Sequence, residues 1–161
     1  MNTTRHETAA SESGTSTASI IFGGVAPPGP AGVGSTESWD GSSWTEIADL
    51  NNGKKLLEIF KKYKPKGVFN LAAETHVDRS IDNPENFIQS NIVGVYNLLE
   101  GFKDLIKTNK SKLIHISTDE VYGDVLSGRS SENYPYQPSS PYAASKAASD
   151  HLVSSYIKTY K

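Results

Sequence analysis

The stretch HISTDEVYG, residues 115–123, carries side chains whose types and spacing suit acid–base chemistry. Within it, an apolar, β-branched run ends in a hydroxyl and two adjacent carboxylic acids, Thr118, Asp119 and Glu120. Two carboxyl groups that differ in protonation at one pH can serve as an acid and a base on one substrate. The position of Asp119 and Glu120 alone is equally typical of a solvated loop start or a helix cap. The surrounding elements must therefore show whether the two acids belong to a functional site.

Tyr142 and Lys146 form a second candidate pair. They stand four residues apart in a helical pattern, so they share one face of that helix. A lysine ammonium near a phenol stabilises the phenolate, and such a tyrosine can take a proton from an alcohol. The spacing Tyr-x-x-x-Lys is also typical of a surface pair on an amphipathic helix, and the pair alone does not choose between the two.

The elements that must position these residues follow an α/β pattern. Apolar spacing predicts, in order, a helix in 51–67, a strand in 67–74, a helix in 82–110, a strand in 112–118, a loop in 121–140 and a helix in 141–160. This alternation predicts an α/β fold with a partial Rossmann-like parallel sheet and flanking helices. Ligands bind beyond the carboxyl ends of strands in such sheets, where Thr118, Asp119 and Glu120 fall.

The first 50 residues differ in composition from the rest of the chain. They contain one basic residue, Arg5, against six acids, and they hold both tryptophans, Trp39 and Trp44. We therefore predict two parts, 1–50 and 51–161. The first part is predicted to be a disordered or short β extension: a disordered 2–19, a strand in 18–22, a loop in 23–35 and a hairpin in 36–47 that turns at Asp40-Gly41. A double glycine followed by spaced tryptophans in residues 20–50 resembles one blade of a kelch-like repeat.

The bulk composition excludes several classes of function. The 161 residues carry a net charge of −2 and contain no cysteine, which excludes disulfides and thiolate chemistry and gives no sign of a nucleic-acid or membrane partner. Neither a membrane-spanning apolar run nor a secretory h-region occurs, so we expect a cytoplasmic protein. The histidines form no metal constellation, and we predict no metal site. His115 lies in the middle of a predicted strand and is expected to be a hydrogen-bonded core residue.

Four longer motifs occur in order between about Gly53 and Tyr160: NLAAETHVDRSI, SNIVGVYNLLE, STDEVYG and PSSPYAASKAASDHLV. Together they resemble the extended short-chain dehydrogenase/reductase family and, within it, the dTDP-glucose 4,6-dehydratases. This resemblance implies NAD-dependent oxidation at C4 of a nucleotide sugar, loss of water across C5–C6 and re-reduction at C6.

The resemblance also implies a role for each catalytic candidate. Tyr142 removes the proton of the 4-hydroxyl, Glu120 removes the C5 proton, and Asp119 protonates the departing 6-hydroxyl. Thr118 hydrogen-bonds the reacting oxygen, and Lys146 supports the tyrosine and holds the nicotinamide ribose.

By the same resemblance, two further segments hold the cofactor and the substrate. The cofactor-binding residues implied, besides Tyr142 and Lys146, are Leu71, Ala72, Ala73, Glu74, Thr75 and Ser90. Thr75 and Thr118 are implied to contact the sugar of dTDP-glucose. Helices 84–107 and 141–160 are implied to form a homodimer interface.

The chain departs from the family in one respect that affects the cofactor. A strand followed by Gly-x-x-Gly-x-x-Gly and a helix, which cradles the pyrophosphate, has no counterpart in residues 1–50. We therefore expect a fragment or a fusion that does not bind NAD+ tightly by itself. Two alternatives stay open: a UDP-sugar dehydratase or epimerase, and a non-catalytic binding or structural protein that uses the tryptophan-rich segment.

Overall fold

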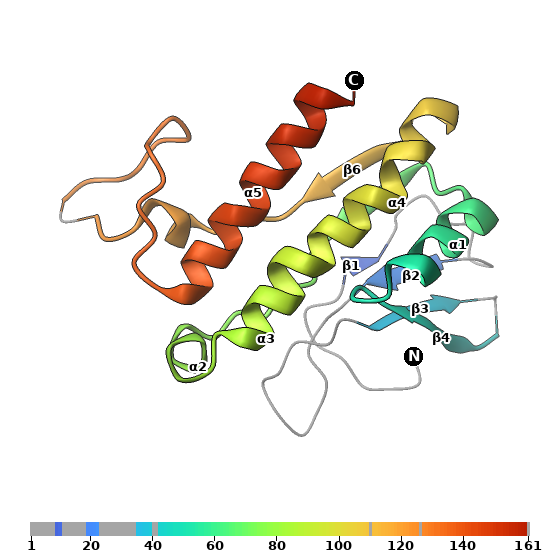
Figure 1. The fold of residues 1–161 in the computed structure, drawn as a ribbon, viewed down its shortest axis with the longest axis horizontal. Coiled ribbons are helices and arrows are strands. Elements are labelled where there is room, and N and C mark those ends of the chain that lie inside the picture. The colour runs from blue at the N-terminus through green and yellow to red at the C-terminus, as the bar shows by residue number, and fades with distance from the viewer. Residues whose placement is uncertain are drawn as a thin grey trace.

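The computed structural model describes residues 9–10, 19–22, 35–39, 42–109, 111–125 and 127–160. They form two sheets and a set of helices (Figure 1). The strands are β1 (Ala9–Ala10), β2 (Ser19–Phe22), β3 (Ser35–Trp39), β4 (Trp44–Asp49), β5 (Gly67–Asn70) and β6 (Lys112–His115). The helices are α1 (Gly53–Tyr63), α2 (Val77–Asp82), α3 (Glu85–Phe87), η1 (Ile88–Val93), α4 (Gly94–Asn109), η2 (Asp119–Tyr122) and α5 (Pro141–Thr159).

The first sheet is antiparallel and has the strand order β1-β2-β3-β4. β3 and β4 form the predicted hairpin, with Trp39 opposite Trp44, while its turn at 40–41 lies outside the described residues. The strand predicted in 18–22 is confirmed as β2. Ala9–Ala10 pair with β2 as a short strand rather than belonging to a disordered segment. The rest of 2–18, and the predicted loop up to residue 34, lie outside the described residues.

The second sheet is parallel and consists of β5 and β6, paired from Gly67 opposite Lys112 to Asn70 opposite His115. The predicted partial Rossmann-like parallel sheet is thus confirmed. Both strands are shorter than the predicted spans 67–74 and 112–118. The last hydrogen bond across the pair runs from the Ile116 N–H to the Asn70 carbonyl, and the chain then continues toward Thr118, Asp119 and Glu120.

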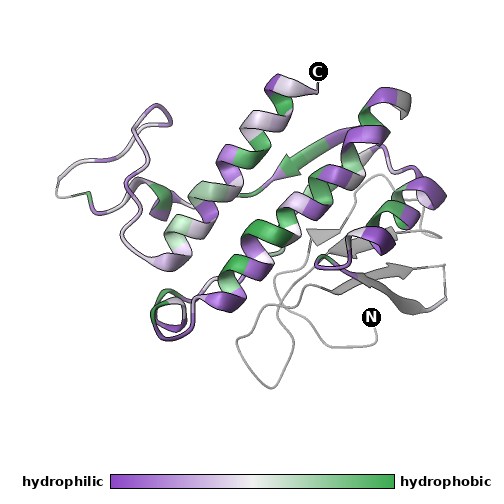
Figure 2. Cartoon of the chain, in the orientation of Figure 1, coloured by the Kyte–Doolittle hydropathy of each residue, from purple (hydrophilic) through white to green (hydrophobic). Residues whose placement is uncertain are grey.

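The helices pack against this pair and against one another. α4 and α5 lie side by side, and α1 lies on the other side of α4 (Figure 1). The core between α1, β5 and α4 holds Leu50, Leu56, Ile59, Phe60, Val68, Ala72, Leu98, Phe102 and Leu105. Phe60 and Phe102 meet edge to face, with ring centroids 6.2 Å apart. Figure 2 shows hydrophobic residues along one side of α1 and α4 and hydrophilic residues along the other.

The single long helix predicted in 82–110 is wrong in detail. α2 precedes it and ends at Asp82, because Asn83, the residue before Pro84, avoids the α conformation and has φ −146° and ψ 89°. The helix then restarts at α3 and passes through the π-helical turn η1 before it continues as α4. Apolar periodicity cannot reveal this turn, because a single extra residue shifts the stripe without removing it.

The last helix forms as predicted. α5 opens with Pro141 at its first position, and the Ser140 hydroxyl accepts a hydrogen bond from the Ala143 N–H at 3.0 Å. Within the described part of the chain, no helix combines the length and the apolar character needed to cross a membrane.

Candidate active site

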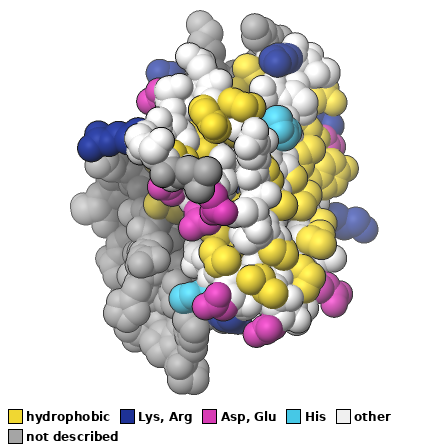
Figure 3. All heavy atoms as spheres, turned by 90° about the vertical axis from the view of Figure 1, so that its left-hand side faces the viewer, with side chains coloured by type: hydrophobic (Ala, Val, Ile, Leu, Met, Phe, Trp, Pro, Cys, Tyr) yellow, Lys and Arg dark blue, Asp and Glu magenta, His cyan; other side chains and the backbone are white. Residues whose placement is uncertain are grey.

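The strand end after β6 holds the first group of candidate residues. Thr118 caps the short helix η2, since its hydroxyl accepts a hydrogen bond from the Glu120 N–H at 3.3 Å. The side chains of Asp119 and Glu120 are exposed and line an open pocket of about 560 Å³, together with Arg129 of the following loop. Figure 3, which faces this loop, shows acidic side chains gathered beside hydrophobic ones. The cap of η2 is therefore Thr118 and not Asp119 or Glu120, whose exposed carboxylates remain open to a ligand.

Tyr142 is held by its backbone and by its ring at the first turn of α5. Its N–H donates to the hydroxyl of Ser80, a fully buried residue of α2, at 3.0 Å. Its ring packs edge to face on Phe87 of α3, with centroids 6.3 Å apart. Because only 8 % of the residue is exposed, the surface-pair interpretation of Tyr142 fails.

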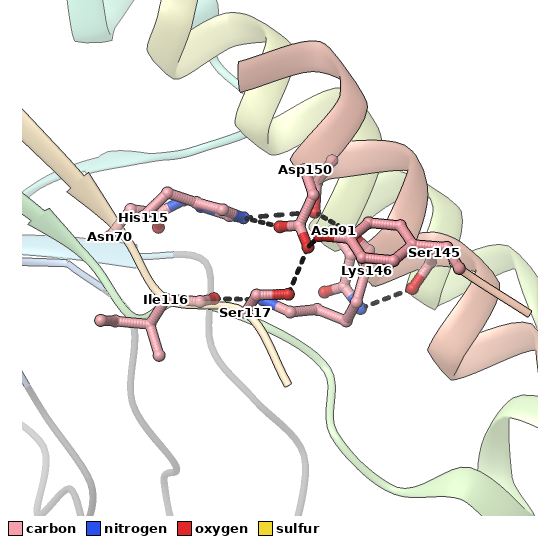
Figure 4. A network of polar contacts seen from close by, with 10 residues as sticks. Asn70, Asn91, His115, Ile116, Ser117, Ser145, Lys146 and Asp150 are labelled. Atoms are coloured by element: carbon pink, nitrogen blue, oxygen red, sulfur yellow. Dashed lines mark hydrogen bonds and ion pairs between the residues drawn. The ribbon is translucent and has the colours of Figure 1, made fainter. Parts of the chain in front are cut away.

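Lys146 lies one turn further along α5 and is 4 % exposed. Its Nζ donates to the Ile116 carbonyl at 2.6 Å, which ties α5 to the end of β6 (Figure 4). Burial lowers the pKa of this ammonium, and the nearby carboxylate of Asp150 opposes part of that effect. Of the three ammonium protons one is used here, so two donors stay available for a ligand.

The segment after β5 contains the residues expected to line a cofactor. Ala72 and Glu74 are buried, whereas Leu71 and Thr75 are exposed. Asn91 of η1 clamps this segment: its Oδ1 accepts from the Glu74 N–H at 2.8 Å and its Nδ2 donates to the Glu74 carbonyl at 3.0 Å. One oxygen of the Glu74 carboxylate is buried and has no hydrogen-bond partner among the described residues.

The same amide of Asn91 reaches α5. Its Nδ2 also donates to the Ser145 hydroxyl at 2.9 Å, and that hydroxyl donates to the Tyr142 carbonyl at 2.7 Å. Asn91 therefore links the end of β5 to the turn of α5 that carries Tyr142. Ser90, expected to touch the cofactor, precedes it in η1 and is half-buried.

His115 is a hydrogen-bonded residue under α5, as its place in the strand predicts. Its Nδ1 lies 3.0 Å from Asn70 Nδ2, and its Nε2 lies 3.3 Å from the Ser149 hydroxyl and 3.5 Å from Asp150 Oδ1. The amide donates to Nδ1, which leaves the proton of the neutral ring on Nε2. Within the described residues no group of histidines and carboxylates is arranged to hold a metal ion.

The structure thus brings together some of the predicted site residues. Lys146 meets the strand end two residues before Thr118, and Tyr142 shares its helix face. Among the described residues, no hydrogen bond joins the Tyr142 hydroxyl to Thr118, Asp119 or Glu120. The convergence of the phenol on the two acids therefore stays a prediction.

Four residues that hold this site together were not predicted from the sequence: Ser80, Asn91, Ser145 and Asp150. One signal was available for Asn91, because this polar residue stands four positions after Phe87 and four before Val95, both buried. A polar side chain in an apolar stripe requires partners inside the fold. Asp150 gave a similar signal, four residues after Lys146 on the same helix.

A parallel strand pair covered by helices, with Tyr142 and Lys146 on a helix at the end of one strand, defines the class of Rossmann-like α/β proteins. The chain belongs to the family described as GDP-mannose 4,6 dehydratase, whose model matches residues 38–161. The match begins inside the hairpin of the first part, and the predicted division near residue 50 stays a prediction.

Curated proteins that are similar to this chain support the same family assignment. The dTDP-glucose 4,6-dehydratase of Haemophilus influenzae is 50 % identical over 123 residues, 71 % of this chain and 36 % of the relative. That of Neisseria meningitidis is 48 % identical over 124 residues, 71 % of this chain and 35 % of the relative. These relatives confirm the resemblance inferred from the motifs. The chain spans about a third of the length of the curated relatives that it matches.

Solved structures support the fold. The UDP-glucose 4-epimerase of Thermus thermophilus in complex with NAD matches with a TM-score of 0.65 and 35 % identity, over 70 % of this chain and 36 % of that one. The dTDP-glucose 4,6-dehydratase DesIV of Streptomyces venezuelae, solved with NAD bound, matches with a TM-score of 0.64 and 38 % identity, over 70 % of this chain and 34 % of that one.

Proposed function

We propose that this chain carries the catalytic centre of an NAD-dependent dTDP-glucose 4,6-dehydratase, a lyase of nucleotide-sugar metabolism. One observation carries the proposal: Lys146 on α5 bonds the end of β6, directly before the hydroxyl and the two exposed acids at 118–120. Epimerase chemistry uses a hydroxyl residue, a tyrosine and a lysine, whereas removal of water also uses an acid and a base. The pair Asp119 and Glu120 therefore favours the dehydratase.

The described residues fit the nicotinamide end of NAD. Two ammonium protons of Lys146 are free to bind the ribose hydroxyls, and the chain at Leu71 to Thr75 leaves the sheet next to the end of β6. The buried, unpartnered oxygen of Glu74 is a polar atom that a bound group can satisfy. When bound, the cofactor would supply a hydride acceptor for the oxidation at C4 and, in its reduced form, the hydride donor for the reduction at C6.

The residues of this chain supply the proton transfers. The Tyr142 phenolate takes the proton of the 4-hydroxyl, and the Thr118 hydroxyl orients the same oxygen. Oxidation at C4 acidifies the C5 proton, which Glu120 removes as Asp119 protonates the leaving 6-hydroxyl. The two acids project from η2 into one open pocket, so both can reach one sugar ring.

A chimera tests the proposal directly. Residues 53–160 replace the matching segment of the Haemophilus influenzae relative, and the purified chimera is incubated with NAD+ and dTDP-glucose. We expect a product that lacks one water by mass spectrometry. Glu120→Gln should lower kcat by about 100-fold or more, because it removes a general base. Glu132→Gln, the same change in the exposed loop, should leave kcat unchanged.

Three outcomes contradict the proposal. A folded, NAD-bound chimera that is inactive would refute it, and one that isomerises its substrate without loss of water would support the epimerase alternative. A chimera in which Glu120→Gln matches Glu132→Gln would remove Glu120 from the mechanism. Separately, a calorimetric titration of the 161-residue chain with NAD+ should show weak binding, since the glycine loop for the pyrophosphate has no counterpart in its sequence.

The proposal includes a homodimer through 84–107 and 141–160 and a cytoplasmic location. Exposed apolar side chains on these helices support the dimer: Ile88, Tyr96, Ile106 and Ile157. Such side chains are typical of protein–protein interfaces. Sedimentation of the chimera and of its Ile157→Glu variant should give a dimer and a monomer.

A further inference from the structure

Asp150 is a half-buried residue of α5 whose carboxylate contacts side chains from several other segments of the chain. Its Oδ2 accepts from the Ser117 hydroxyl at 2.5 Å and from the Tyr136 hydroxyl at 3.1 Å. Its Oδ1 lies 3.5 Å from His115 Nε2 (Figure 4). These partners come from β6, from the strand end after it and from the loop that leads to α5, so one carboxylate joins three segments.

Lys146 and Asp150 hold successive residues of the same strand end. They stand one turn apart on α5, and their partners are the Ile116 carbonyl and the Ser117 hydroxyl. Thr118 comes next in the chain and carries the hydroxyl that the proposed mechanism uses. The position of Thr118 relative to α5 is therefore fixed by two side chains of the helix, of which the mechanism uses only Lys146.

The charges around Asp150 suit a permanent acceptor. Burial by itself raises the pKa of Asp150, but hydrogen bonds from His115, Ser117 and Tyr136 lower it more, so the pKa lies below its ordinary value. Burial and the neighbouring carboxylate raise the pKa of Tyr136 to about 12. The ammonium of Lys146 faces the carboxylate from the same helix. At neutral pH the carboxylate thus accepts and the phenol donates.

We propose that Asp150 is a positioning residue, whose bond to Ser117 holds the strand end 116–118 in register with Lys146 on α5. It acts through Ser117 and not by touching substrate or cofactor. The proposal rests on the proposed function for its catalytic consequence. The bond between Asp150 and Ser117, called the clamp in this subsection, can be measured without substrate or NAD.

Amide hydrogen exchange on the 161-residue chain tests the clamp. The Ile116 N–H bonds the Asn70 carbonyl, and the Lys112 N–H bonds the Lys66 carbonyl at the opposite end of the strand pair, both at 3.0 Å. Asp150→Asn should speed exchange at Ile116 by about tenfold and leave Lys112 within about twofold, because only the clamped end opens.

Four further variants separate the clamp from general destabilisation. Ser117→Ala should reproduce the effect at Ile116, and combining it with Asp150→Asn should add little, since both variants disrupt the bond between Asp150 and Ser117. Ser117→Thr keeps the hydroxyl and should restore normal exchange. Glu100→Gln is the matched control: this carboxylate of α4 also accepts from a phenol of α5, that of Tyr156, at 2.6 Å, but lies far along the helix from the site. It should leave Ile116 unchanged.

In the active chimera, Asp150→Asn should lower kcat about tenfold with KM within about twofold, because the strand end is misplaced while binding residues remain. Unchanged kcat would overturn the positioning role. If Asp150→Asn speeds amide exchange equally at Ile116 and Lys112, or at neither of them, the proposed clamp is wrong. An inactive chimera refutes the proposed function, while the exchange results still decide whether the clamp exists.

Discussion

Replacing Asn91 by alanine removes the clamp between the end of β5 and α5. The side chain is 1 % exposed and makes three hydrogen bonds, two to the Glu74 backbone and one to the Ser145 hydroxyl. Alanine offers no donor or acceptor, and the site is closed to bulk water. The Glu74 N–H and carbonyl are then left unpaired, whereas Ser145 keeps its bond to the Tyr142 carbonyl.

The expected loss can be worked out from these orphaned groups. A buried backbone donor without a partner costs about 1–3 kcal/mol, and the lost bond at the carbonyl adds about 1 kcal/mol. We therefore expect Asn91→Ala to lower the free energy of unfolding by about 3 kcal/mol. Asn97→Ala on α4 is the matched control, because it removes a single half-buried bond to the Leu50 carbonyl. It should cost about 1 kcal/mol.

Urea unfolding followed by far-UV circular dichroism measures both losses. The midpoint of Asn91→Ala should fall below that of Asn97→Ala by about 1 M urea, given ordinary denaturant slopes. Equal midpoints would refute the reasoning, since they would mean that the Glu74 backbone finds other partners and that Asn91 does not link the two elements.

Two further predictions concern packing and pH. Gly101→Ala should lower the free energy of unfolding in urea by about 1–3 kcal/mol, because its Cβ would lie 2.8 Å from the buried ring of Phe60. Gly67→Ala is the control and should not destabilise the fold, because its Cβ would have no described atom within 4 Å. Equal effects would contradict the close packing of α1 on α4. The pKa of Asp150 is lowered in the fold, so its stabilisation is present above the unfolded value of about 4 and is lost as the pH falls through the folded value. The difference in unfolding free energy between the unsubstituted chain and Asp150→Asn should therefore shrink from about pH 6 toward about pH 2, and a difference independent of pH would contradict this.

The sequence predicted those elements whose signals are local. Ser140 and Pro141 mark the start of α5, and its observed end at Thr159 lies within a residue of the prediction. The apolar spacing in 51–67 likewise predicted α1, in which Leu56, Ile59 and Phe60 are buried and Leu57 is half-buried. These features depend on neighbours within a turn or two, which a sequence displays directly.

The parts that sequence did not predict depend on distant partners. α2 has six residues and no side-chain cap of its own, and it is fixed by the bond from Tyr142 to Ser80, 62 positions away. The strands stop early because the paired segment ends where the chain bends toward α5. The polar clamps of Asn91 and Asp150 likewise join residues 17 to 54 positions apart, and no local pattern specifies such a pairing.

Because of the π-helical turn Ile88–Val93, the orientation of α4 depends more on the number of residues in this segment than on the identity of its exposed side chains. Its closing bond runs from the Gly94 N–H to the Gln89 carbonyl, five residues back. If the turn became an ordinary α-helix with the same number of residues, α4 would rotate by about 100° relative to α3. That rotation would carry Leu98 and Phe102 away from α1, or Asn91 away from Glu74. Homologous chains that keep this number of residues between α3 and α4 should therefore keep the π-helical turn, and exposed Gln89 should tolerate substitution.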